Sequence, residues 1–213
     1  MVGAARVAVL ISGRGSNMLA LHDRITEDGI AARIVGVATD SEHAAGIELA
    51  AERGLPTAVV DRARYDDRRA HEVAMSEVLT GWSPDYVCLA GYMRILSAAF
   101  LERWQGQVLN IHPSLLPAFP GLDTHQRALD AGVCVHGCTV HFVTPGVDEG
   151  PIIAQAAVPV RADDDAETLA ARVLREEHRL YARALADVTC GTVRLQAGRV
   201  VRRQGSGAVL QVE

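Results

Sequence analysis

The sequence predicts an α/β protein built on a doubly wound, mostly parallel sheet with helices on both faces. Two observations carry this prediction. Short runs rich in β-branched residues alternate with amphipathic segments through the first half of the chain. These runs are apolar almost throughout, which is typical of parallel strands that are covered on both sides. Ligands of such sheets bind beyond the carboxyl ends of the strands, so polar residues at those ends are the first candidates for a functional site.

Each element of the first half follows from its own pattern. Five apolar runs are predicted to be strands, namely 7–11, 34–38, 57–60, 86–90 and 108–111. A first helix follows the first strand, with Met18, Leu21 and Ile25 at helical spacing. A second helix is predicted over 44–53, ended by Gly54. A third is predicted over 66–79, and its apolar positions are Ala70, Val73, Ala74 and Val78.

The second half has a different pattern. Strands are predicted over 140–143 and 152–160, joined by a loop that contains Pro145 and Gly146. A long helix is predicted over 165–186, and two short strands, 192–195 and 199–202, meet through Gly198 in a terminal hairpin. Because the chain contains no convincing linker and no repeat, residues 1–213 are predicted to form one domain, with a core over 6–186 and a tail over 187–213.

Composition narrows the class of protein. Hydrophobic residues make up 49% of the 213 residues, too many for a disordered chain. No apolar run reaches the roughly 18 residues that a membrane helix needs, and the start of the chain does not resemble a signal peptide, so we expect a cytoplasmic protein. The net charge of −5 argues against a nucleic-acid partner. The four cysteines form no CxxC pair and are expected to be reduced thiols.

A glycine-rich turn, Gly13-Arg14-Gly15-Ser16-Asn17, joins the first strand to the first helix. Glycine lets a backbone approach an anion closely, and the N–H groups of a helix start can bind phosphate. A dinucleotide-binding turn is an alternative, because Asp40 ends the second strand where such folds place a ribose-binding acid. That pattern, however, needs glycine where Met18 stands. A third possibility is a tight turn with Ser16 or Asn17 as a simple helix cap.

Asn110 and His112 lie at the carboxyl end of the fifth predicted strand. Alternation along a strand points both side chains to the same side. An asparagine amide can donate a hydrogen bond to a developing oxyanion, and a histidine can gain or lose a proton near neutral pH. The position of the pair at a strand's carboxyl end favours a functional role, against the alternative of two polar core residues that are satisfied by the backbone.

Motifs along the chain resemble those of the phosphoribosylglycinamide formyltransferases, also called GAR transformylases. The matching stretches run in order over about residues 6–186. They are Val9–Asn17, Leu89–Leu96, Leu109–Pro117, Pro120–Leu122, His136–Val143, Val147–Ile153 and Glu177-His178.

The resemblance implies a set of roles. The formyl donor would be 10-formyltetrahydrofolate, the acceptor would be the ribonucleotide GAR in purine (IMP) biosynthesis, and no metal would take part. Asn110, His112 and Asp148 would form the catalytic trio, and the peptide bond Leu116-Pro117 would be cis. The ligand contacts would fall on Gly15, Ser16 and Asn17 for the phosphate of GAR, on Glu177 for its ribose, on Met93, Arg94, Ile95, Leu96 and Asn110 for the pterin end of the folate, and on Arg68 for its glutamate end.

The sequence also departs from that family's pattern. Arg14 stands where relatives often have asparagine, Asp123 stands where they often have histidine, and Pro145-Gly146 alters the loop on the folate side. The tail after Ala186 matches weakly and carries no implied role.

Three alternatives remain. A methionyl-tRNA formyltransferase shares a similar core but adds an RNA-binding domain, and a formyltetrahydrofolate deformylase normally carries an extra N-terminal domain. A non-catalytic nucleotide-binding module would leave the trio incidental. A zinc site at Cys134, His136, Cys138 and His141 is disfavoured, because alternation places these residues on both faces of one strand.

Overall fold

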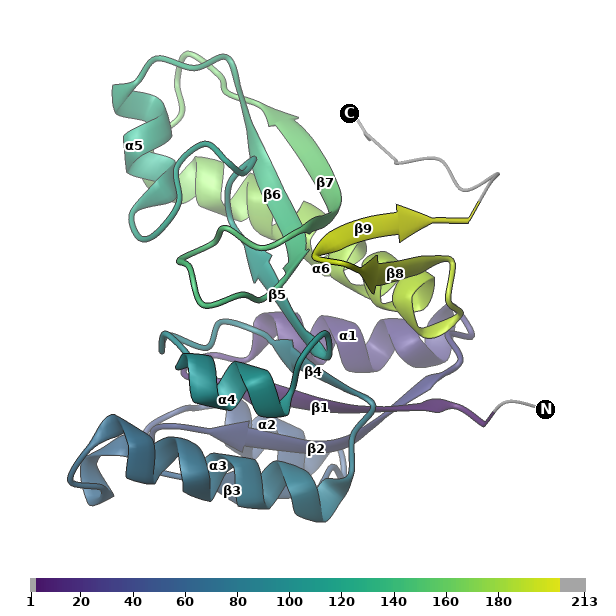
Figure 1. Ribbon diagram of the computed structural model, residues 1–213. Coiled ribbons are helices and arrows are strands. Elements are labelled where there is room, and N and C mark those ends of the chain that lie inside the picture. The colour runs from purple at the N-terminus through teal and green to yellow at the C-terminus, as the bar shows by residue number, and fades with distance from the viewer. Residues whose placement is uncertain (1–2, 204–213) are drawn as a thin grey trace. The chain divides into compact units, whose positions relative to one another are not determined.

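A computed structural model describes residues 3–203 of the chain (Figure 1). These residues fall into two compact units, one up to Asn110 and one from Ile111 on. The strands of the main sheet follow the order β3-β2-β1-β4-β5-β6-β7, and β8 and β9 form a separate two-stranded sheet. The predicted mostly parallel sheet and the terminal hairpin are confirmed.

The first unit alternates strands and helices as the sequence predicts. Its elements are β1 (Ala5–Ile11), α1 (Ser16–Glu27), β2 (Ala32–Thr39), α2 (Gly46–Glu52), β3 (Thr57–Val59), the 3-10 turn η1 (Arg62–Arg64), α3 (Arg68–Trp82), β4 (Tyr86–Leu89), α4 (Ala98–Arg103) and most of β5 (Val108–His112). Every strand pair among them is parallel. The central strand β1 is fully buried from Val7 to Ile11, which explains its unbroken apolar run.

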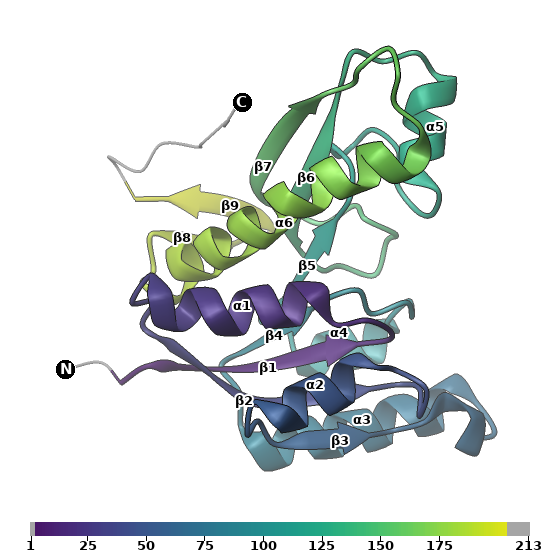
Figure 2. The ribbon, with the colours of Figure 1, turned by 180° about the vertical axis from the view of Figure 1, so that it is seen from behind.

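Helices cover both faces of the first unit. The helices α3 and α4 lie in front of the strands in Figure 1, whereas α1 and α2 lie in front in the opposite view of Figure 2. Short helix α4 was not anticipated, because six residues are too few to establish a helical period.

The buried face of α3 differs from the predicted one. The sequence indicated Ala70, Val73, Ala74 and Val78, but Val73 is 50% exposed and Met75 is fully buried. The face that packs inward consists of His71, Glu72, Met75, Ser76 and Leu79. The prediction was wrong because polar residues on this face find internal partners. His71 Nε2 donates to the Val60 carbonyl at 2.8 Å, and Glu72 accepts from Ser97.

The second unit is built around a long helix and an antiparallel strand pair. It contains α5 (Thr124–Asp130), β6 (Val135–Phe142), β7 (Ile152–Pro159), α6 (Ala166–Thr189), β8 (Val193–Gln196) and β9 (Arg199–Arg202). A capping box between Asp165 and Thr168 starts α6, and its apolar face packs on β6 and β7. Strand β6 begins earlier than the predicted 140, because small and polar residues such as Gly137 and Thr139 conceal it in the sequence.

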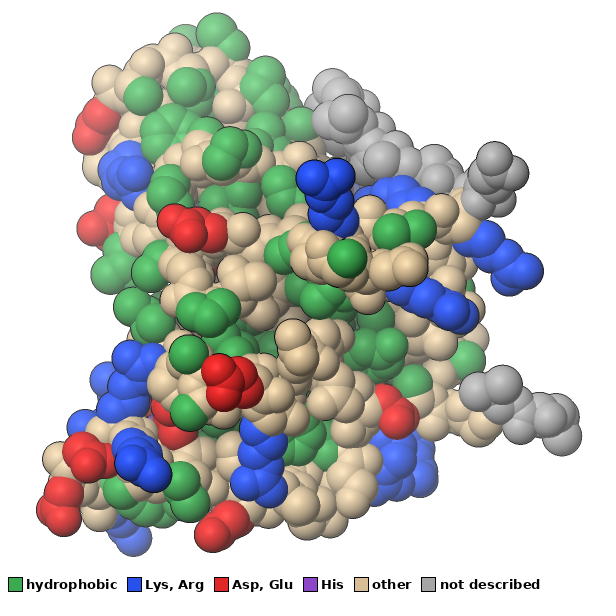
Figure 3. Space-filling model, in the orientation of Figure 1, with side chains coloured by type: hydrophobic (Ala, Val, Ile, Leu, Met, Phe, Trp, Pro, Cys, Tyr) green, Lys and Arg blue, Asp and Glu red, His purple; other side chains and the backbone are tan. Residues whose placement is uncertain are grey.

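Acidic and basic side chains gather together around the start of α3, as Figure 3 shows at the lower left.

Among the described residues, no helix combines the length and the apolar character needed to cross a membrane.

Two substitutions on α3 test its observed face. Met75→Ala should lower the free energy of unfolding by about 2–5 kcal/mol, because it opens a cavity in a packed core. Val73→Ala, on the face that the sequence favoured, should change it by less than about 0.5 kcal/mol. Urea denaturation of both variants measures the difference, and equal losses would mean that the assigned face is wrong.

Candidate active site

The carboxyl end of β5 supplies the first two candidate residues. Asn110 lies opposite Leu89 of the neighbouring strand β4 and is half-buried. His112 ends the strand and is 6% exposed. Because the two residues are two positions apart in one strand, their side chains leave it on the same side.

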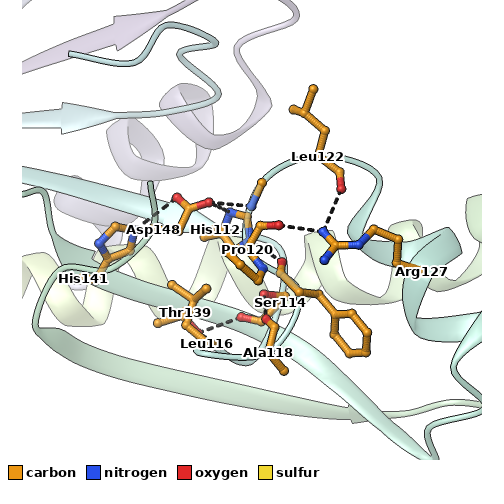
Figure 4. Close-up of polar contacts among 12 residues, drawn as sticks. His112, Ser114, Leu116, Ala118, Pro120, Leu122, Arg127, Thr139, His141 and Asp148 are labelled. Atoms are coloured by element: carbon orange, nitrogen blue, oxygen red, sulfur yellow. Dashed lines mark hydrogen bonds and ion pairs between the residues drawn. The ribbon is translucent and has the colours of Figure 1, made fainter. Parts of the chain in front are cut away.

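His112 faces an acceptor on each ring nitrogen. Its Nε2 lies 3.0 Å from the carbonyl oxygen of Phe119, and its Nδ1 lies 3.3 Å from Oδ2 of Asp148 (Figure 4). A carbonyl oxygen can only accept, so Nε2 carries a proton. A bare Nδ1 would turn a lone pair toward a carboxylate, so the arrangement favours a proton there as well. The geometry therefore fits an imidazolium that is paired with Asp148.

Asp148 reaches His112 from the loop between β6 and β7. Its Oδ2 also accepts the N–H of Gly121 at 2.8 Å. The backbone of Asp148 adopts the left-handed region with φ 55. A side chain at Gly150, two residues further on, would overlap the Phe142 carbonyl, so this turn requires glycine there. The loop is thus shaped to present one carboxylate to two donors.

His141 on β6 is a third member of the site, to which the sequence analysis gave no role. Its Nδ1 donates to the Phe142 carbonyl at 2.9 Å, and its Nε2 lies 3.8 Å from Oδ1 of Asp148. Burial lowers the pKa of His141, although the Phe142 carbonyl and the charge of Asp148 act in the opposite direction. His141 is consequently a neutral neighbour of Asp148. The sequence feature that could have pointed to His141 was its position in the repeated polar pattern of 136–141.

Two buried polar residues fix the loop that follows His112. Thr139 Oγ1 donates to the Ser114 carbonyl at 2.7 Å and accepts the Leu116 N–H at 3.0 Å. Gln155 of β7 donates from Nε2 to the Leu116 carbonyl at 2.8 Å and to Thr139 Oγ1 at 3.0 Å. The expected cis peptide between Leu116 and Pro117 is confirmed. Neither Thr139 nor Gln155 was recognised from sequence, because nothing local marks a partner that lies on another strand.

Arg127 of α5 holds the next part of the same loop. Its Nη1 donates to the carbonyls of Pro120 at 2.6 Å and of Leu122 at 3.2 Å, and its guanidinium lies 5.7 Å from the Phe119 ring centroid. These contacts fix the carbonyl of Phe119 and the N–H of Gly121, which are the backbone groups that meet His112 and Asp148.

Two further histidines pack near this loop. His136 contacts His125 and Phe119 edge-on, with ring centroids 5.3 Å and 5.9 Å away. Burial, reinforced by the charge of His125, lowers the pKa of His136 to about 4. Burial also lowers the pKa of His125 and raises that of the Cys138 thiol. Over residues 3–203, no group of three or more histidine, cysteine or acidic side chains is arranged to hold a metal ion.

The glycine-rich turn lies in the first unit. Gly15 precedes α1 with φ 75, a left-handed conformation that favours glycine, and it has no side chain to cap the helix. A Cβ on Gly15 would come within 2.8 Å of the Cα of Gly46, whose N–H donates to the Gly13 carbonyl at 3.0 Å. Gly46 thereby shapes the turn, a role that the sequence analysis missed because the two glycines are far apart in the chain.

The remaining candidates also have defined positions. Met93 and Ile95 are 67% and 59% exposed, Leu96 is buried, and Arg94 pairs with Asp40. Arg68 forms an ion pair with Glu72 on its own helix.

Two of the candidates for binding GAR are buried, Asn17 at the start of α1 and Glu177 on α6. Among the departures from the family pattern, Arg14 and Asp123 are exposed, as is Pro145, while Gly146 is half-buried.

The arrangement around β5 can stabilise negative charge. An amide donor and a positively charged imidazole at one strand end can serve an oxyanion, and a fixed carboxylate can hold the imidazole charged. This is the chemistry of addition to a carbonyl carbon.

Comparison with known proteins points to the same chemistry. The family model described as formyl transferase matches residues 5–185. The phosphoribosylglycinamide formyltransferase of Escherichia coli is 43% identical over 175 residues, 82% of each chain. The trifunctional purine biosynthetic protein adenosine-3 of Bos taurus is 51% identical over 197 residues, which cover 92% of this chain and 20% of that protein. The crystal structure of glycinamide ribonucleotide transformylase 1 from Symbiobacterium toebii is 46% identical, with a TM-score of 0.91 and 95% of each chain covered.

The low pKa of His136 predicts a loss of stability in mild acid. The unfolded chain takes up a proton near the ordinary value of 6.5, whereas the folded chain does so only near 4. The free energy of unfolding should therefore fall as pH drops from 6.5 toward 4. His136→Gln should weaken this fall, and His43→Gln, at a histidine that is 87% exposed, should not. Melting curves at pH 7 and pH 5 measure the effect, and identical pH dependence in all three proteins would contradict it.

Proposed function

Because the chain belongs to the formyl transferase family, we propose that it transfers the formyl group of 10-formyltetrahydrofolate to the glycinamide amine of 5′-phosphoribosylglycinamide. The products are formyl-GAR and tetrahydrofolate, in purine biosynthesis. The observation that carries the proposal is the contact of 3.3 Å between His112 Nδ1 and Asp148 at the carboxyl end of β5. It supports a charged donor at the position where an oxyanion forms.

In the proposed reaction the amine nitrogen of GAR attacks the formyl carbon of the folate. The carbonyl π electrons move to oxygen and give a tetrahedral oxyanion. Asn110 donates an amide N–H to this oxygen, and the His112 imidazolium supplies a charged N–H. The N–H at Nε2 of His112 exchanges its hydrogen-bond partner: it donates to the neutral Phe119 carbonyl before the reaction and to the charged oxygen, the stronger acceptor, once that oxygen forms.

The intermediate then collapses with cleavage of the bond between carbon and the folate nitrogen. The attacking nitrogen loses a proton, and the departing nitrogen gains one. Asp148 keeps His112 charged while the oxyanion exists, and Gly121 keeps Asp148 in place. One such donor contributes about 3–4 kcal/mol to the barrier reduction, so the two donors together account for a substantial part of the catalysis.

Ligand binding is assigned to the first unit and to α6. The turn Gly15-Ser16-Asn17 binds the GAR phosphate with the N–H groups of the α1 start, where the helix dipole also favours an anion. Glu177 binds ribose hydroxyls. The segment Met93–Leu96 receives the pterin ring, and Arg68 meets the glutamate end of the folate.

The activity itself is the first test. Purified protein with GAR and 10-formyltetrahydrofolate should yield formyl-GAR and tetrahydrofolate without ATP or added metal, followed by chromatography of both products. Hydrolysis of the folate alone, or formylation of methionyl-tRNA in place of GAR, would overturn the assignment.

Asp148→Asn tests the charged donor. An asparagine oxygen can still accept from Gly121, but its amide would donate to His112 Nδ1 and favour a neutral ring. We expect kcat to fall by about two orders of magnitude or more, with a much smaller change in the KM of either substrate. Glu149→Gln removes the same charge from the next residue, which is exposed, and should leave kcat unchanged. Near-normal turnover in Asp148→Asn would mean that this carboxylate is not catalytic.

Ser16→Ala tests the phosphate turn without disturbing the packing of Gly15 on Gly46. Losing one hydrogen bond to a charged phosphate should raise the KM for GAR about tenfold and leave the KM for the folate unchanged. Thr26→Ala removes a hydroxyl from the exposed far end of α1 and is the matched control. An equal rise for both substrates would place the phosphate elsewhere.

A further inference from the structure

Three polar side chains from three different elements meet the segment Gly91–Ser97. They are Ser12, which follows β1, Asp40, which follows β2, and Glu72 on α3. All three lie in the first unit, and none of them had a role in the proposed reaction. The segment that they meet is the one assigned to the pterin ring.

Ser12 holds the start of the segment with two hydrogen bonds. Its N–H donates to the Gly91 carbonyl at 3.2 Å, and its Oγ accepts the N–H of Met93 at 2.8 Å. Gly91 has φ 75, so the chain turns sharply at this point.

Asp40 holds the middle of the segment. Its side chain is 2% exposed, and its Oδ2 accepts from Nε of Arg94 at 2.6 Å, whereas the side chain of Arg94 is 51% exposed. A buried carboxylate is costly without a positive partner, so this pair strongly favours one backbone position for Arg94. Asp40 is also the residue that would bind a ribose if the fold bound a dinucleotide, and here its carboxylate is paired with Arg94 instead.

Glu72 holds the end of the segment. It is buried, and it accepts the N–H of Ser97 at 2.8 Å and also the Ser97 hydroxyl. Ser97 in turn caps α4 through the Phe100 N–H at 3.2 Å. Glu72 also accepts from Nε of Arg68 at 3.0 Å, so it connects the residue assigned to the glutamate end of the folate with the pterin segment.

The segment alternates between anchored and exposed residues. Tyr92 and Leu96 are buried and Arg94 is held by Asp40, whereas Met93 and Ile95 between them are exposed. Burial raises the pKa of Tyr92, and the negative charge of Asp40 raises it further. The positive charge of Arg94 lowers this pKa, and the charge of Glu72 makes a smaller contribution that raises it. The two carboxylates thus enclose the buried side of the segment and leave its other side open to a ligand.

We propose that Asp40 and Glu72 are positioning residues for the folate, because they fix the main chain of Met93–Leu96 through Arg94 and Ser97. The side chain of Arg94 then acts as an internal clamp, and the folate is bound by the main chain around it. This inference rests on the proposed function, since it presumes that the segment binds the folate.

Asp40→Asn is the direct test, with kinetics measured separately for each substrate. It should raise the KM for 10-formyltetrahydrofolate about tenfold while kcat and the KM for GAR change less than about twofold. The matched control is Glu42→Gln, two residues further along the same loop as Asp40. It removes a half-exposed carboxylate that pairs with Arg64, and it should leave both KM values and kcat unchanged. An unchanged folate KM in Asp40→Asn would overturn the proposal.

A double-mutant cycle with Arg94→Gln separates a clamp from a direct ligand. If Asp40 acts through Arg94, either single variant and the double variant should all raise the folate KM to a similar extent. Independent effects that multiply in the double variant would mean that Arg94 contacts the folate itself, and would overturn the clamp.

Glu72→Gln keeps the test decisive if Asp40→Asn fails to fold. It should also raise the folate KM about tenfold with little change in kcat, whereas Glu77→Gln, on the exposed side of α3, should not. A normal folate KM in Glu72→Gln would overturn its role. Failure of the proposed function would look different, because the unaltered protein would then transfer no formyl group to GAR.

Discussion

The arrangement of the site at the end of β5 depends on the carboxylate of Asp148. Its Oδ2 accepts from the Gly121 N–H at 2.8 Å and lies 3.3 Å from His112 Nδ1, so one side chain connects the end of β5 with the loop before α5. A largely buried negative charge is tolerated only where donors surround it. The left-handed backbone of Asp148 and the glycine that the turn requires at position 150 are local costs, and the two contacts of the carboxylate help to offset them.

Three other histidines of the second unit lie near His112, and their surroundings lower their pKa values. Burial lowers the pKa of His125, His136 and His141, and the like charge of a protonated His112 lowers each of them further. Both His112 and His141 face a backbone carbonyl on one nitrogen and Asp148 on the other, but His112 lies closer to the carboxylate, at 3.3 Å against 3.8 Å. The lowered pKa values of these three rings keep a second cation away from the end of β5, where the proposed reaction uses His112 as the charged donor.

The sequence was informative where a local pattern has one structural solution. Unbroken apolar runs predicted β1 and β4, and the spacing of Asn110 and His112 placed them on one side of β5. It was misleading where burial depends on a distant partner. The inward face of α3 carries His71 and Glu72, which are tolerated inside because Val60 and Ser97 supply their hydrogen bonds. Thr139 and Gln155 escaped notice for the same reason, since a polar residue in a strand reveals its role only when its partner is known.

Asp40 shows how this limit bears on function. Its position after β2 is the one where a dinucleotide-binding fold carries an acid for ribose, and the sequence alone could not choose between that role and another. In the folded chain Asp40 is buried, and its Oδ2 accepts a hydrogen bond from Arg94 at 2.6 Å. The observed contact therefore favours a structural role for this carboxylate over the binding of a ribose. In the role proposed above, Asp40 acts on the folate through the main chain to which Arg94 belongs, which is the segment from Met93 to Leu96.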